Sequence, residues 1–247
     1  SVEAVKHLDA TTIDELLDFY EKFHKPNNAI IVVAGHIEKK QAKQWIEEYF
    51  GPIKKGNLIP KKEYVEEPIT EEIRATWKDP NVQIPMYLTA YRTPSMKSRD
   101  ARILDMISMV LSDGKSSRLY KRLVDVEKKA LELGSFNFSQ EDYGTYFTYA
   151  LPIGETTMDE IIDVFSDEIK KLQTDLISER EYQTIINKLE NRYVSSNSNV
   201  EGVAHNLATY YLLYKDVNLV NTEMDIYRSI TREEIREAAN KYLNDNQ

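Results

Sequence analysis

The sequence reads Leu131-Glu-Leu-Gly-Ser-Phe-Asn-Phe-Ser139, then Gln140-Glu-Asp142, then Tyr143-Gly-Thr-Tyr-Phe-Thr-Tyr-Ala-Leu151. The two longer runs are rich in aromatic and β-branched residues and alternate around a short polar turn. This pattern predicts an antiparallel hairpin over 131–139 and 143–151. Two further strands are predicted before it, over about Ile73–Trp77 and Val82–Tyr91.

Helical patterns surround the hairpin. Apolar residues recur every three or four positions in each of seven segments, and Gly114 separates the first two. The predicted helices are Arg99–Leu111, Ser116–Val126, Met158–Leu172, Ser178–Val194, Val200–Tyr214, Leu219–Ser229 and Thr231–Leu243. Strands come first as a group and helices follow, without strict βαβ alternation. We therefore expect an α+β fold, with an antiparallel sheet and helices packed on it.

The first 56 residues carry a separate pattern. Thr12 and Glu15 form a capping box that opens an amphipathic helix. A short apolar run over Ala29–Gly35 predicts a buried strand, and Glu38–Phe50 predicts a second helix. We expect residues 1–56 to be a helix–strand–helix segment, 57–70 to be a polar linker rich in chain-breaking residues, and 71–247 to be a second, fuller domain.

The last predicted helix resembles the first. Thr12–Asn27 aligns without gaps on Thr231–Asn246, with matching threonine and glutamate at the caps. Any two capped amphipathic helices share some of this likeness, so a chance match stays open. A true repeat implies duplicated halves and a chain cut at both ends. It also implies an unpaired sheet edge in the second half, through which we expect self-association.

Composition excludes several classes of function. The formal net charge of the 247 residues is −9, and no long block of Lys or Arg is present, which argues against a nucleic-acid partner. The absence of cysteine excludes disulfides, thiol nucleophiles and cysteine-based metal sites. No apolar run approaches the roughly 18–20 residues that cross a bilayer, so no membrane association is expected. Composition does not distinguish a bacterial cytoplasmic location from a periplasmic one.

Several motifs, taken together in order, carry a family resemblance over about 11–246. They are Thr12-Ile-Asp-Glu-Leu-Leu-Asp-Phe-Tyr20, Pro26-Asn-Asn-Ala29, Tyr49-Phe-Gly-Pro-Ile53, Tyr91-Arg-Thr-Pro-Ser95 and Gly114-Lys-Ser-Ser-Arg-Leu-Tyr120. In this order the sequence resembles the pitrilysin/insulinase-like zinc metallopeptidases, which include proteins similar to the mitochondrial processing peptidase. The resemblance places residues 1–56 at the end of a first homologous half and 71–247 in a second, non-catalytic half.

The resemblance also says where the metal should be. The family binds zinc through His-x-x-Glu-His on a helix plus a later glutamate, and the motif glutamate activates the metal-bound water. The four histidines here are His7, His24, His36 and His205, and no two are three to five residues apart. We expect no metal ligand and no catalytic residue in this chain. Zinc is expected only in the complete enzyme or in a partner half.

Two groups of residues are candidates for contact with substrate. The Gly-x-Ser-Ser-Arg-Leu-like motif suggests a substrate-binding role for Ser116, Ser117 and Arg118, although Ser116 also fits a helix N-cap. Many relatives carry an arginine and a tyrosine that bind the substrate backbone beside the zinc. The alignment places apolar Val124 and Leu131 at these two positions. Either the alignment slips by a residue or two, or this half has lost the pair.

The resemblance implies the substrate-chamber or scaffold portion of a zinc-dependent metalloendopeptidase that acts on peptides or unfolded proteins. Its partners would be an N-terminal catalytic half, or a catalytic partner subunit, and a peptide substrate. The alternative is a non-catalytic structural or binding subunit that retains the peptidase fold. On either interpretation, the chain alone is expected to be inactive.

Overall fold

The structure contains the predicted hairpin. In the computed structural model, which describes residues 2–62 and 64–245, strands β2 (Ala130–Ser139) and β3 (Tyr143–Pro152) pair antiparallel. The backbone N–H of Gln140 donates to the carbonyl of Tyr143 at 3.1 Å and closes the turn. A third strand, β1 (Tyr87–Pro94), pairs antiparallel with β3, so the strand order is β1-β3-β2.

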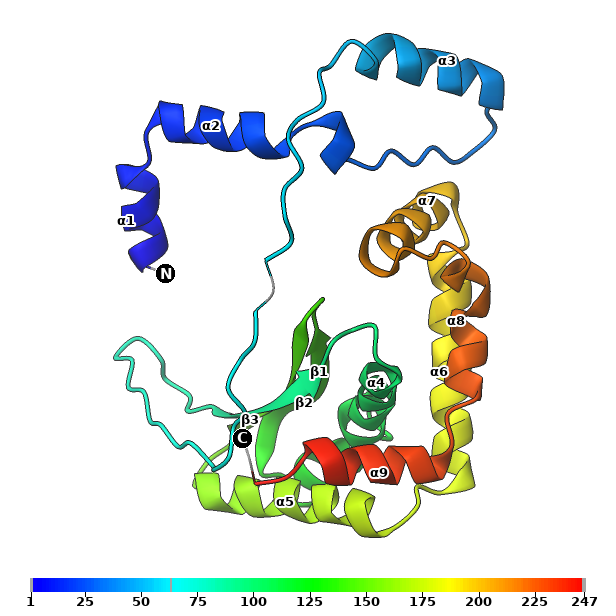
Figure 1. Cartoon of the computed structure of the whole chain (residues 1–247). Coiled ribbons are helices and arrows are strands. Elements are labelled where there is room, and N and C mark those ends of the chain that lie inside the picture. The colour runs from blue at the N-terminus through cyan, green and yellow to red at the C-terminus, as the bar shows by residue number, and fades with distance from the viewer. Residues whose placement is uncertain (1, 63, 246–247) are drawn as a thin grey trace. The chain divides into compact units, whose positions relative to one another are not determined.

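Three helices cover one face of this sheet (Figure 1). They are α4 (Arg99–Ser112), α5 (Met158–Thr174) and α9 (Arg232–Tyr242). Their apolar stripes and the inward side chains of the strands form one core, in which Leu104, Ile107, Tyr146, Phe165 and Ile235 are fully buried. Each such side chain contributes about 1.5–3 kcal/mol through the apolar surface it removes from water. The α+β class expected from the sequence is confirmed.

Several helices begin at a side-chain cap. The hydroxyl of Thr157 accepts the N–H of Glu160 at 3.3 Å, and the Glu160 carboxylate accepts the N–H of Thr157 at 2.9 Å. The same reciprocal pair opens α9 at Thr231 and Glu234. Each pair satisfies N–H groups that a helix N-terminus leaves without an intrahelical partner.

The remaining predicted helices are also present, with shifted ends. They are η2 (Tyr120–Val126), α6 (Glu179–Ser196), α7 (Val200–Thr209), η3 (Tyr210–Tyr214) and α8 (Leu219–Arg228). Both η2 and η3 are wound as π-helices, which the apolar spacing did not predict. Among the helices that the structure describes, none has the length and apolar character needed to cross a lipid bilayer.

Two predicted strands are wrong. The segment Ala29–Gly35 and the segment Ile73–Trp77 form no strand, and β1 begins at Tyr87 rather than at Val82. The apolar side chains of both segments stay in contact with solvent, and Trp77 is 93% exposed. A strand is stable only when its backbone pairs with a neighbour. Within the described residues neither segment has such a neighbour.

The chain divides into two compact units by its internal contacts. One comprises Ser1–Glu63 with Ser196–Val220, and the other comprises Tyr64–Ser195 with Asn221–Gln247. The first unit holds α1 (Val2–Ala10), α2 (Ile13–Phe23), η1 (Pro26–Asn28) and α3 (Lys39–Phe50). The second unit holds the sheet with its covering helices. The division of the sequence into 1–56, 57–70 and 71–247 stays a prediction.

The likeness between the first and last capped helices is partly reflected in the structure. Helices α2 and α9 each have 11 residues and begin with a Thr–Glu capping box. However, α9 buries Ile235, Ala238 and Ala239, whereas no residue of α2 is buried. The two helices are equivalent in local structure but not in packing, and a true sequence repeat stays a prediction.

Limited proteolysis tests the predicted linker. Exposed Lys61, Lys62, Arg74 and Lys78 lie in irregular backbone, which a protease can bind in extended form. Trypsin at low ratio is expected to cut first in 61–78 and to leave a resistant fragment that contains the sheet. Mass spectrometry of the early fragments identifies the cuts. The matched control is Arg180, which is exposed but lies within α6; a first cut there would contradict the prediction.

Candidate functional site

One face of the sheet is not covered by the helices of its own unit. Because side chains alternate along a strand, the strand register assigns a second set of residues to this open face. The set comprises Leu88, Ala90, Arg92, Glu132, Gly134, Phe136, Phe138, Thr145, Phe147, Tyr149 and Leu151. Leu88, Phe136 and Phe138 are about half exposed, at 52%, 45% and 54%. We call this surface the open face.

Aromatic side chains form the centre of the open face. The rings of Phe136 and Phe147 lie opposite each other on β2 and β3, with centroids 5.2 Å apart. Tyr149 extends over Gly134, since a Cβ at position 134 would lie 2.4 Å from the tyrosine ring. Glycine therefore lets the ring lie flat on the neighbouring strand. The result is an apolar surface without a covering element in the second unit, which is typical of a contact surface.

Charged groups on the open face are already paired. The phenol of Tyr149 donates to the Glu132 carboxylate at 3.0 Å. Arg92 forms an ion pair with Glu66, and its guanidinium lies 5.7 Å from the ring centre of Tyr143. The aromatic centre is therefore the part of the open face that is free to contact an apolar side chain of another molecule.

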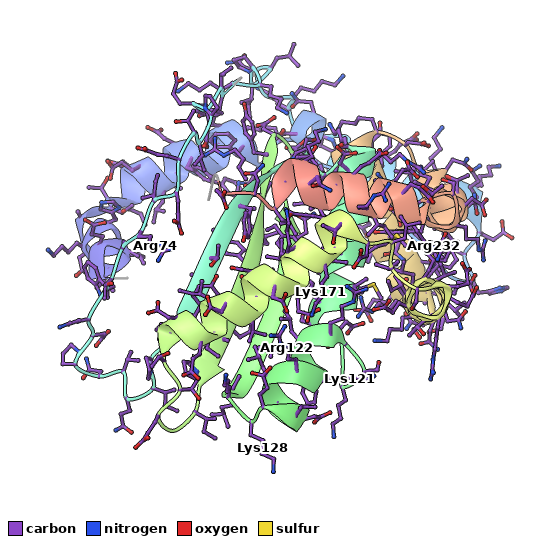
Figure 2. All side chains as sticks on the ribbon, turned by 90° about the horizontal axis from the view of Figure 1, so that it is seen from below. Arg74, Lys121, Arg122, Lys128, Lys171 and Arg232 are labelled. Carbon is purple, nitrogen blue, oxygen red and sulfur yellow. The ribbon has the colours of Figure 1, made fainter. Side chains whose placement is uncertain are left out.

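Elsewhere on this unit, basic side chains are neutralised by acidic neighbours. Arg122 bonds to Glu127 at 2.8 Å and to Glu168 at 3.1 Å, and it also pairs with Asp167. Lys171 bonds to Glu168 at 2.9 Å. Figure 2 shows Arg122 beside α5, the helix that carries Lys171. Such a balanced network does not make the one-signed field that attracts a phosphate backbone.

The structure gives Ser117 and Arg118 contacts within the fold. The Ser117 hydroxyl donates to the carbonyl of Gly114 at 2.7 Å and is buried, while Ser116 is exposed in the preceding turn. Arg118 forms a forked pair with Glu181, at 2.7 and 3.1 Å. Glu181 also accepts the N–H of Ser178 at 2.8 Å, where α6 begins. A substrate-binding role for Ser116, Ser117 and Arg118 stays a prediction.

The contribution of the Arg118–Glu181 pair to the free energy of unfolding should decrease at acid pH. Burial opposes ionisation, but the hydrogen bonds from Arg118 and Ser178 outweigh it and lower the pKa of Glu181 to about 2. A lowered pKa means that the stabilisation is present above the ordinary pKa near 4.5 and is lost as the pH falls toward 2. Because the pair is partly exposed, Glu181→Gln is expected to cost about 1 kcal/mol at pH 7. Urea unfolding at pH 7 and pH 2.5 should show this cost shrinking; an equal cost at both pH values would contradict it.

Val124 and Leu131 are not enclosed in the core. Val124 is half-buried on η2, and Leu131 is 56% exposed where β2 begins, next to an irregularity in its pairing with β3. Neither position has the full burial that an ordinary core residue would show. The loss of a substrate-binding Arg/Tyr pair at these positions stays a prediction.

Sequence reasoning missed the aromatic centre of the open face. The alternation predicted the hairpin but not which phase faces the helices; on β2, Phe136 and Phe138 face outward, whereas Ser135 and Asn137 face the helices. The available signal was on β3, where Tyr146 and Ala150 occupy one phase and Phe147, Tyr149 and Leu151 occupy the other. A strand that is apolar on both faces has two surfaces to cover. Among residues 2–62 and 64–245, no cluster of three His, Asp or Glu side chains is placed to hold a metal ion.

The second unit is thus an antiparallel sheet that helices cover on one face and that presents an aromatic surface on the other. Residues 10–189 match the family described as "Peptidase M16 inactive domain". The chain belongs to this family, which confirms the resemblance to the pitrilysin/insulinase-like peptidases.

Two individual relatives support this family assignment. The chain is 25% identical to the zinc protease PqqE of Helicobacter pylori over 96% of this chain and 53% of that protein. It is 22% identical to an uncharacterized zinc protease of Rickettsia felis, over 96% of this chain and 56% of that protein. The chain thus spans little more than half of each relative.

Solved structures show the same fold. A protease from Helicobacter pylori superposes with a TM-score of 0.89 at 22% identity, over 97% of this chain and 58% of that one. The M16 inactive domain from Pseudomonas fluorescens superposes with a TM-score of 0.76 at 17% identity, over 96% of this chain and 56% of that one. The chain is an M16 inactive domain with similarity to zinc proteases, and in this family the zinc belongs to the catalytic half.

Proposed function

We propose that the open face is the part of this chain that contacts peptide in a closed proteolytic chamber. The zinc-bearing counterpart would supply the metal and the activated water, and this half would supply a wall that holds unfolded polypeptide near them. The observation that supports this is the cluster of Phe136, Phe147 and Tyr149 on a sheet face that the helices of its own unit leave open. Aromatic rings bury a large apolar area for little loss of side-chain freedom, so they suit varied apolar side chains.

A chain of this kind should increase the activity of its counterpart without having activity itself. The experiment measures hydrolysis of an unfolded, fluorescently labelled protein by this chain alone, by the zinc-bearing half alone and by both together. We expect no hydrolysis by this chain and at least a tenfold gain when the halves are combined, since positioning lowers the barrier of the chemical step. If hydrolysis does not increase when the two halves are mixed, the proposal that the open face is a chamber wall is wrong.

Substitutions on the open face locate the effect. Phe147→Ser and Leu88→Ser remove apolar area from the open face and should lower the gain several-fold. Val126→Ser is the matched control, because Val126 is 76% exposed on η2 and lies outside the open face. Equal losses in all three variants would point to general destabilisation, and thermal unfolding of each variant measures that directly.

A scaffold or binding subunit without a proteolytic role is the second candidate. It is favoured by the apolar residues at Val124 and Leu131, which cannot offer charge-assisted or hydroxyl hydrogen bonds to a peptide backbone. In the assembled protein, Val124→Arg with Leu131→Tyr should raise hydrolysis if the two positions face the peptide. Binding of unfolded protein without any gain in hydrolysis would support the scaffold instead.

A further inference from the structure

A groove lies along the outer edge of β2, within the second unit. It has a volume of about 360 Å³, at the lower end of the range for small-ligand sites. One wall is the C-terminal half of α4, with Ser108 and Ser112, and Asp113 follows directly after the helix. The other wall is β2 from Leu133 to Phe136, and Arg192 of α6 lies at its border. None of these residues belongs to the ion pairs described above.

The backbone of β2 faces this groove. Ser112 supplies a hydroxyl that accepts the N–H of Ser135 at 2.7 Å and donates to the carbonyl of Ser135 at 3.2 Å. Both groups of Ser135 therefore point away from β3. Peptide groups alternate in direction along an antiparallel strand, so the N–H and C=O of Leu133 also point outward. The Ser112 hydroxyl thus binds the outward backbone groups of Ser135, whereas those of Leu133 face the groove.

The floor of the groove is aromatic. Gly134, Phe136 and Tyr149 all line it, and the Tyr149 ring lies over Gly134. This surface is continuous with the open face and accepts a single apolar side chain. The three hydroxyl-bearing residues Ser108, Ser112 and Ser135 form the opposite, polar side.

The border of the groove carries an excess of one positive charge. Asp113 accepts from Arg192 at 3.0 Å and from Lys188 at 3.1 Å, so two cations share one carboxylate. Arg192 is 60% exposed and bonds to Asp113 through one of its terminal nitrogens, Nη2. An arginine fork can hold a second carboxylate in the geometry that it favours.

We propose that this groove binds the C-terminal end of an extended peptide. The peptide backbone would pair with the outward groups of Leu133, its last apolar side chain would lie on Tyr149 and Phe136, and its terminal carboxylate would bind Arg192. The small volume and the Ser112 hydroxyl on Ser135 favour a chain end over a chain that passes through. This inference rests on the proposed function, because hydrolysis of a peptide bond releases a new C-terminal carboxylate.

The test compares two probes on the 247-residue chain. One is an N-acetylated, fluorescently labelled hexapeptide of alternating valine and threonine that ends in phenylalanine with a free carboxylate. The other is the same peptide with a C-terminal amide. We expect amidation to weaken binding about tenfold in fluorescence anisotropy, the size typical of one charge-assisted hydrogen-bonding pair.

Substitutions assign the difference to the groove. Arg192→Gln should reduce the acid–amide difference to less than about twofold, whereas Arg180→Gln, an exposed position of α6 outside the groove, should leave it unchanged. Equal binding of acid and amide by the unsubstituted chain would overturn the proposal. So would an Arg192→Gln variant that keeps the full difference. A further competitor is an amidated peptide with an internal aspartate. If it competes as strongly as the free acid, the groove binds a side-chain carboxylate and the proposal of a C-terminal carboxylate is wrong.

An experiment can distinguish failure of the groove proposal from failure of the proposal that the open face is a chamber wall. Phe147 lies on the open face but does not line the groove. Phe147→Ser should lower the gain in hydrolysis of unfolded protein and keep the acid–amide difference. If the gain is present in the assembled protein and the acid–amide difference is absent, the groove proposal alone is wrong.

Discussion

Replacing Arg102 with methionine should cost about 3–5 kcal/mol of unfolding free energy, because it leaves a carboxylate without its partner in the interior. Arg102 lies on α4 and forms a forked pair with Glu223 of α8, at 2.8 and 2.9 Å. The two side chains are only 8% and 13% exposed. Without the arginine, the Glu223 carboxylate would have no charged partner in a place that little water reaches.

A double-mutant cycle separates the pair from the packing around it. Arg102→Met with Glu223→Leu removes both charges and fills similar volume, so it should recover most of the loss of the single variant. Arg228→Met is the matched surface control: its pair with Glu190 is 51% and 39% exposed, and its loss should be below about 1 kcal/mol. Chemical denaturation at neutral pH measures Arg102→Met, Glu223→Leu, the double variant and Arg228→Met. A cost below about 1 kcal/mol for Arg102→Met would show that the pair is solvated in solution.

Asp105→Asn should stabilise the protein at neutral pH. Asp105 is partly buried on α4, where it accepts from the Tyr227 phenol at 3.2 Å and from the Asn137 amide at 3.4 Å. Burial raises the pKa of Asp105 to about 6, although these hydrogen bonds and Arg102 oppose the rise. The full difference from the ordinary value of 3.8 converts to about 3 kcal/mol. Part of the side chain stays solvated, so we expect a gain of about 1–2 kcal/mol.

The sign of this effect follows from proton linkage. A raised pKa means that the folded state holds the proton more tightly, so the penalty is full above pH 6 and is relieved as the pH falls toward 4. The gain from Asp105→Asn should therefore be present at pH 7.5 and absent below pH 4. Glu181→Gln gives the opposite pH dependence and serves as the internal comparison. A gain that does not change between these pH values would mean that the Asp105 charge is not its cause.

Local sequence signals predicted the elements that depend on local chemistry. The hairpin follows from alternation around Gln140–Asp142, and the capped helices follow from Thr12 and Thr231. Both are decided by residues within a few positions of one another. The strand propensity of Ala29–Gly35 and Ile73–Trp77 was real, but pairing requires a neighbour that propensity cannot specify.

The site was harder to predict for the same reason. Which phase of the hairpin the helices cover depends on packing between distant segments, so the aromatic face was not predicted from alternation alone. The π-helical winding of η2 and the left-handed backbone of Lys128, with φ of 51°, follow no side-chain preference at these positions. Arg192 and Ser112 come from helices far apart in the sequence, and only the fold brings them to the edge of β2.

The Ser112 hydroxyl on Ser135 also decides how copies of this chain could associate. With that position of β2 occupied, a full-length strand cannot be added there, and among the described strands β1 is the other edge of the sheet. The alternation along β1 directs the N–H and C=O groups of Ala90 and Arg92 outward. Two copies that join through β1 are related by a two-fold axis, and the β1 edge of each copy is then covered by the other copy. Growth would then stop at a pair, so we expect no fibre growth through the edges of this sheet.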